Sequence, residues 1–110
     1  MPVLAPEIID IGPEELRHVA VDFTGKLDTG ELLNGTPTAV EVGTTDLVIT
    51  TVLVSTSTLT INGVSVVAGL AIQFTVDPVG ATPDKTYQID VVSPTDVAQE
   101  VSLGVLLHII

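Results

Sequence analysis

The run Asp28-Thr29-Gly30-Glu31 brings together residue types that could bind a metal ion. Its carboxylate and hydroxyl oxygens are the ligands that Ca²⁺ prefers in proteins. The run lacks the alternating ligand spacing and the closing glutamate of an EF-hand loop. We therefore predict a solvated loop here in preference to a calcium site.

Two histidines, His18 and His108, are the other candidates for chemistry. A catalytic histidine needs a second group within hydrogen-bond reach, and the spacing gives no reason to pair either one with Asp22 or Ser102. We expect each histidine to be a strand side chain at a surface or an interface. The sequence has no GxGxxG, GK[ST] or HExxH motif and no cysteine. We therefore predict that the protein is not an enzyme and has no catalytic residue, cofactor or metal ligand.

The net charge limits the possible partners. Fourteen acidic residues stand against Arg17, Lys26 and Lys85, which gives a formal charge of −11. Binding to nucleic acid or to anionic lipid normally requires clustered Lys and Arg that displace counterions. We therefore predict no nucleic acid and no membrane as partners. An alternative explanation for the acidity is that it keeps the protein soluble.

The segment 47–76 contains no charged residue. A membrane-spanning helix needs about 20 predominantly apolar residues, whereas this segment is interrupted by Ser and Thr at 55–58 and by Asn62-Gly63. Its apolar residues alternate with polar ones at period two, as in strands. We predict that its Val, Leu and Ile line a core and that its Thr and Ser face outward.

The same alternation, broken by turns rich in Gly, Pro and Asp, predicts eight strands along the chain. They are expected near residues 16–24, 38–43, 46–54, 57–61, 64–67, 70–76, 85–92 and 97–107. Short strands at this spacing predict an all-β fold, most simply an antiparallel β-sandwich. The inward set is expected to include Leu70, Ile72, Phe74, Val76, Tyr87, Ile89 and Val91, and the outward set Ala71, Gln73 and Thr75.

Two local features support this interpretation. Asn62-Gly63, between Ile61 and Val64, tolerates the two positive φ values that a type I′ hairpin turn requires. Tyr87 stands at the start of a late strand, a few residues after a Pro/Asp turn. At this position β-sandwiches have a tyrosine corner, in which the hydroxyl is tied to an upstream backbone group.

The two ends of the chain are unusually apolar. Residues 1–13 are predicted to form an extended N-terminal arm, because Pro2, Pro6 and Pro13 exclude a helix and an interior strand, and residues 14–110 a single β-sandwich domain. The ends either pack on this domain or contact a neighbouring subunit. The interface candidates are Val3, Leu4, Ile8, Ile9 and Ile11 in the arm, and Leu106, Leu107, His108, Ile109 and Ile110 at the C-terminal end.

Two stretches, PEELRHVAVDFTGKLDTGELL and VAGLAIQFTVDPVGATPDKTYQIDVV, resemble small immunoglobulin-like virion proteins of tailed bacteriophages. The first has an acid-rich step after proline, a strand that ends in an aromatic residue and a Gly/Asp loop; the second has paired strands around a Gly-Ala-Thr turn. The resemblance covers roughly residues 12–105. It implies an Ig-like antiparallel β-sandwich of about seven or eight strands with the extended arm added.

The resemblance also implies a function and a location. The leading hypothesis is a capsid decoration, or cement, protein that binds the outer surface of the shell and bridges capsid subunits. Its partners would be the major capsid protein, copies of itself or both, as a homo-oligomer for which a trimer is plausible. The N-terminus has no signal-peptide pattern, as expected for a virion protein made in the host cytoplasm. The alternatives are a neck or tail adaptor that joins a fiber to the particle, and a calcium- or carbohydrate-binding surface module.

Overall fold

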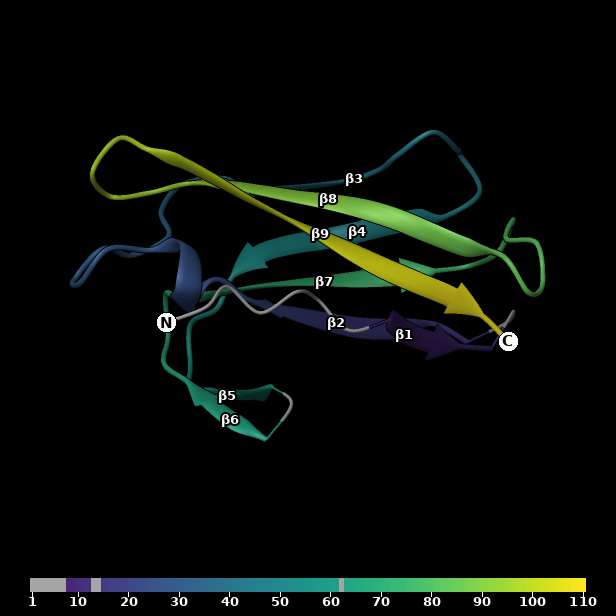
Figure 1. Ribbon diagram of the computed structural model, residues 1–110, viewed down its shortest axis with the longest axis horizontal. Coiled ribbons are helices and arrows are strands. Elements are labelled where there is room, and N and C mark those ends of the chain that lie inside the picture. The colour runs from purple at the N-terminus through teal and green to yellow at the C-terminus, as the bar shows by residue number, and fades with distance from the viewer. Residues whose placement is uncertain (1–7, 13–14, 62) are drawn as a thin grey trace.

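The computed structural model describes residues 8–12, 15–61 and 63–110 (Figure 1). These residues form an all-β fold with one short 3₁₀ turn, η1 (Thr24–Lys26). In this described part of the chain, no helix is long and apolar enough to cross a membrane. The nine strands are β1 (Ile8–Ile11), β2 (Arg17–Asp22), β3 (Thr38–Glu41), β4 (Val48–Val54), β5 (Leu59–Ile61), β6 (Val64–Val66), β7 (Ala71–Asp77), β8 (Thr86–Pro94) and β9 (Glu100–Ile109).

The described strands form three small sheets, and none of these sheets closes into a barrel. The first sheet has the order β1-β9-β8-β3, in which β1 runs parallel to β9 and the other pairs are antiparallel. The second has the order β2-β7-β4 and is antiparallel throughout. The hairpin β5-β6 is the third sheet, and Figure 1 shows it projecting away from the other two.

The hydrophobic core is built by inward-facing side chains of the two larger sheets. Successive residues of a strand point to opposite faces, so alternate residues of β8 and β9 are buried from one sheet and alternate residues of β2 and β7 from the other. The core residues are Ile11, Val19, Val21, Phe23, Leu33, Ile72, Phe74, Val76, Tyr87, Ile89, Val91, Leu103, Val105, Leu107 and Ile109.

Each of the eight predicted strands overlaps an observed strand. The inward set predicted for β8 is confirmed, and so are Ile72, Phe74 and Val76 of β7. The predicted hairpin is also confirmed, because Ile61 pairs with Val64. Gly63 has a φ of 78°, and Asn62 lies outside the described residues. The prediction for Ala71 is wrong: this residue is buried and not outward-facing.

The prediction that Val, Leu and Ile of the uncharged segment 47–76 line the core is confirmed for β7, confirmed in part for β4 and wrong for the hairpin β5-β6. Strand β7 supplies fully buried core residues, and Ile49, Val52 and Val54 of β4 are partly buried and pack against the core, whereas Leu53 is exposed. The residues of β4 are only partly buried because β4 is an edge strand, and the hairpin β5-β6 lies outside the core cluster because it forms a sheet of its own. In the hairpin, Val64 is exposed and Val66 is buried outside the main core cluster.

Strand β4 contains a strained residue at its irregularity. Its register with β7 shifts between Thr50 and Leu53, and Thr51 has a φ of 56°. A β-branched residue is disfavoured in this left-handed region, which asparagine tolerates. We expect Thr51→Asn to raise the free energy of unfolding by about 1 kcal/mol, as measured by urea denaturation. Thr50→Asn is the control, because Thr50 pairs regularly with Thr75; equal stabilisation by both substitutions would exclude strain as the cause.

Candidate functional site

The two ends of the described chain meet at one edge of the four-stranded sheet. Strand β1 pairs with β9 from Ile8 opposite Leu106 to Ile11 opposite Ile109, and the Ile110 N–H donates to the Ile11 carbonyl over 2.9 Å. Strand β9 is therefore an interior strand, between β1 and β8. Four residues of the predicted arm form the edge strand that covers it.

The predicted interface residues divide into two groups. Ile11, Leu107 and Ile109 are fully buried in the core of the chain itself. Leu106 and Ile110 remain 36% and 62% exposed. Ile8 and Ile9 contribute backbone pairing in β1, while Val3 and Leu4 lie outside the described residues.

His108 lies between two carboxylates on the outer face of this edge. Its Nδ1 is 3.1 Å from Oδ1 of Asp10 in β1, and its Nε2 is 3.4 Å from Oδ1 of Asp84 in the turn before β8. A neutral imidazole has one N–H and a protonated one has two, so only the protonated ring can donate to both carboxylates. The prediction that His108 is a strand side chain near a surface is confirmed.

His18, the other histidine, faces outward from β2, where its Nδ1 is 3.0 Å from the Thr75 hydroxyl on β7. Its predicted role as a surface strand side chain is also confirmed. The two histidines lie in different sheets. The structure therefore gives them separate surroundings and does not bring them together.

Glu15 accepts two hydrogen bonds between β1 and β2. Its carboxylate accepts the Gly12 N–H over 2.9 Å and lies 3.0 Å from Nη1 of Arg17. The Gly12 hydrogen bond and the Arg17 charge lower the pKa of Glu15. Because the folded-state pKa is lowered, any contribution to stability is present at neutral pH and is lost as the pH falls through that pKa.

The Tyr87 hydroxyl joins two loops at one end of the core. It accepts the Thr82 N–H over 2.9 Å and donates to Oδ2 of Asp46 over 2.8 Å. The prediction that this hydroxyl is tied to an upstream backbone group is confirmed by the Thr82 bond. The same two loops approach closely at Gly80, where a Cβ atom would lie 2.9 Å from the Asp46 carbonyl oxygen. The Gly80 N–H donates to that oxygen over 3.1 Å.

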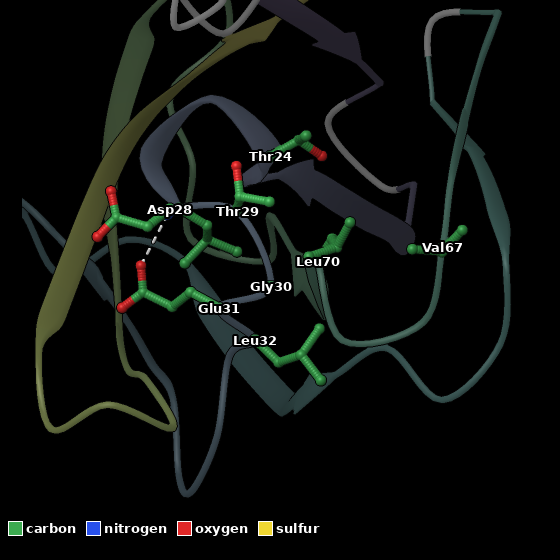
Figure 2. Close-up of a pocket in the computed structure, with 9 residues that line it drawn as sticks. Thr24, Asp28, Thr29, Gly30, Glu31, Leu32, Val67 and Leu70 are labelled. Carbon is green, nitrogen blue, oxygen red and sulfur yellow. Dashed lines mark hydrogen bonds between the residues drawn. The ribbon is translucent and has the colours of Figure 1, made fainter.

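A pocket of about 430 Å³ lies beside the loop that follows β2 (Figure 2). It is lined by residues 24 and 27–32 of this loop and by Val67 and Leu70. The loop is fixed to the segment after β8, because the Leu32 N–H donates to Oδ1 of Asp96 and the Asp96 N–H donates to the Leu32 carbonyl. The Leu33 N–H also donates to the Gly69 carbonyl over 2.9 Å. The loop is therefore attached to two separate parts of the fold.

Glu31 in this loop is only 4% exposed. Its Oε1 accepts the Asp28 N–H over 2.9 Å, whereas its Oε2 is buried and has no hydrogen-bond partner among the described residues. Leaving such a group unsatisfied costs about 1–3 kcal/mol, and more when it is charged. The prediction of a solvated loop is wrong for Glu31. The hydrogen bonds of Leu32 to Asp96 and of Leu33 to Gly69 hold the loop against the domain.

Neither family models, nor curated proteins, nor solved structures match this chain. Within residues 8–12, 15–61 and 63–110, no group of three or more His, Cys, Asp or Glu side chains is placed to hold a metal ion. The features that remain as candidates are the exposed apolar side chains beside the paired ends and the buried carboxylate of Glu31. The sequence identified the first, and the burial of the second emerges only from long-range contacts.

Proposed function

We propose that this chain is a structural protein of a tailed-bacteriophage virion. It folds as an Ig-like β-sandwich, binds the outer surface of the capsid shell and bridges neighbouring subunits. Its partners are the major capsid protein, further copies of the same chain, or both.

The observation that carries this proposal is the exposure of Leu106 and Ile110 beside the paired ends. Removing apolar surface from water contributes about 25 cal/mol per Å², so two exposed side chains on a rigid edge can stabilise a contact between subunits. The Ile110 N–H bond to Ile11 and the pairing of Leu106 with Ile8 hold both backbone positions in place. We propose that these two residues contact the shell, with Val3 and Leu4 adding to the contact.

Two features of the fold support the Ig-like assignment. Side chains from the two larger sheets share one core, and the Tyr87 hydroxyl is bonded to the Thr82 backbone in the manner of a tyrosine corner. The formal charge of −11 agrees with an exposed outer surface that stays soluble and does not bind nucleic acid.

Binding of purified variants to particles that lack the protein tests the proposed contact. We expect Leu106→Ser with Ile110→Ser to weaken binding about tenfold or more, because burying one large aliphatic side chain contributes about 1.5–3 kcal/mol and 1.4 kcal/mol is a factor of ten. The matched control is Val79→Ser with Val97→Ser, since both valines are also exposed apolar residues and lie in loops outside the paired ends. Equal loss in the two double variants, or no loss in the first, would contradict the proposed contact.

The copy number of the protein tests its position in the particle. We expect densitometry of purified virions to give a ratio to the major capsid protein that matches a shell-wide arrangement. A ratio close to that of the portal would contradict the decoration role and favour an adaptor in the neck or tail.

A further inference from the structure

Strand β9 is covered along only part of one side. On the side of β8 it is paired from Glu100 to His108. On the other side, β1 pairs with residues 106–109 alone. Figure 1 shows β9 continuing past β1 toward the turn that follows β8. Among the described residues, 100–105 therefore form an open edge of the four-stranded sheet.

The hydrogen bonds of β9 show which backbone groups are open at this edge. Successive residues of a strand direct their N–H and C=O groups to opposite sides. The Ile109 N–H donates to the carbonyl of the residue before β8, whereas the Ile110 N–H donates to the Ile11 carbonyl next to β1. Even-numbered residues of β9 therefore face the side of β1. Ser102 and Gly104 lie on this side, and their N–H groups donate to no described residue.

The apolar cover of β9 also decreases along the open half. The exposed fraction of its inward-facing side chains rises with distance from β1: Val105 is 1% exposed, Leu103 is 9% exposed and Val101 is only partly buried. Leu107 and Ile109, which lie opposite β1, have no exposed surface. An open edge is a template for a further strand, and proteins normally cover or protect it. A strand is therefore missing beside this half of β9.

We propose that residues 2–7 of the same chain extend β1 along this open edge. These residues lie outside the described part of the chain. The four pairs of β1 with β9 share an offset of 98 residues, from Ile8 opposite Leu106 to Ile11 opposite Ile109. Continued toward the N-terminus, this offset places residues 2–7 opposite 100–105, which is the whole open edge. The segment is joined directly to Ile8, so each further pair forms next to an existing one and no loop has to close.

The positions of the prolines agree with this pairing. Because the Ile11 carbonyl accepts a hydrogen bond from β9, alternation along the strand directs the backbone groups of residues 3, 5, 7 and 9 to β9 as well. Pro2 and Pro6 fall on the opposite side of the strand. Proline has no N–H, and edge strands accept it where the missing N–H faces away from the neighbouring strand. The opposite alternation would place both prolines against β9 and exclude the pairing.

The same prolines close the extended strand against a further partner. A strand that adds to the outer side of β1 needs N–H donors at even-numbered positions, and positions 2 and 6 have none. Proline on an edge strand is one way in which proteins prevent edge-to-edge association. The N-terminal segment thus covers the edge of the sheet. This role does not involve the side chains of Leu106 and Ile110, so the inference and the proposed function can fail independently.

Amide hydrogen exchange of the full chain, followed by NMR, tests the inference. In the paired segment, the Ser102 and Gly104 N–H groups donate to the carbonyls of residues 3 and 5. We expect both amides to exchange at least about tenfold more slowly in the native chain than in Ala5→Pro, which removes an N–H that faces β9. Leu4→Pro is the matched control. The N–H at position 4 faces away from β9, so this substitution should leave both amides protected.

The amides of Leu103 and Val105 are an internal reference, because they face β8 and should be protected in every variant. Loss of their protection would show that a substitution disturbs the sheet itself. In that case NOEs between residues 3–7 and 101–105 of the native chain decide, since they require no substitution. Absence of these NOEs would overturn the inference.

Three exchange results would also contradict the inference. Rapid exchange of Ser102 and Gly104 in the native chain would mean that the edge is open. Equal protection in the native chain and in Ala5→Pro would assign the edge to another group, and to a second copy if protection rises with protein concentration. Equal loss of protection in Ala5→Pro and Leu4→Pro would exclude the alternation on which the pairing depends.

Discussion

Replacing Ile11 by alanine should lower the free energy of unfolding by about 2–5 kcal/mol, the usual cost of truncating a fully buried isoleucine. Ile11 has no exposed surface and belongs to the same core cluster as Ile109, its partner across the β1-β9 pair. Its removal leaves a cavity at the edge of the sheet and weakens the attachment of β1. Urea denaturation followed by circular dichroism measures the change.

Two controls show whether the effect arises from the core contact. Ile11→Val removes one methylene group and should cost about 0.5–1.5 kcal/mol. Leu16→Ala truncates an exposed residue between β1 and β2 and should change the stability by no more than about 0.5 kcal/mol. A cost below 1 kcal/mol for Ile11→Ala would mean that β1 is not part of the folded domain. In that case residues 1–11 could be deleted without loss of folding.

Replacing Tyr87 by phenylalanine should cost about 1–3 kcal/mol, because it removes one hydroxyl and leaves two polar groups without their partner. The ring stays in the core, so packing is preserved and the change isolates the bonds to the Thr82 N–H and the Asp46 carboxylate. Tyr87 is the only tyrosine and there is no tryptophan, so circular dichroism is again the suitable measurement. A cost below 0.5 kcal/mol would contradict the proposed link between the two loops.

A double-mutant cycle with Asp46→Ala separates the two bonds of the hydroxyl. Residues in one hydrogen-bonded network typically show coupling energies of about 0.5–3 kcal/mol. We therefore expect the double variant to be less destabilised than the sum of the single variants. The remaining effect of Tyr87→Phe in the Asp46→Ala background reports the bond from the Thr82 N–H.

The local features of the fold could be predicted because short-range rules determine them. Alternation at period two identifies inward residues such as Ile89 and Val91, and Asn62-Gly63 marks the hairpin between β5 and β6. Strand β1 was not predicted, although Pro2, Pro6 and Pro13 exclude only a helix and an interior strand and β1 is an edge strand. The segment 8–11, between Pro6 and Pro13, contains no proline and is long enough for one edge strand.

The errors concern contacts between distant residues. The apolar residues of β4 are only partly buried because β4 lies at the edge of the second sheet, and no pattern within residues 48–54 predicts that place. Glu31 is predicted to be solvated because the run Asp28-Thr29-Gly30-Glu31 lacks the ligand spacing of an EF-hand loop. Its burial follows from the bonds of Leu32 to Asp96 and of Leu33 to Gly69, far along the chain.

The position of β9 between β1 and β8 also has a consequence for the order in which the protein forms. Asp10 and His108, which lie opposite each other in this pair, are 98 residues apart in sequence. The residues of β1 emerge early during synthesis, yet they have no partner strand until residues 106–109 have been made. Proteins dominated by such non-local pairings fold in about milliseconds to seconds. The pair β3-β8 can form before β9 is made, whereas β1 can join the four-stranded sheet only after the synthesis of β9.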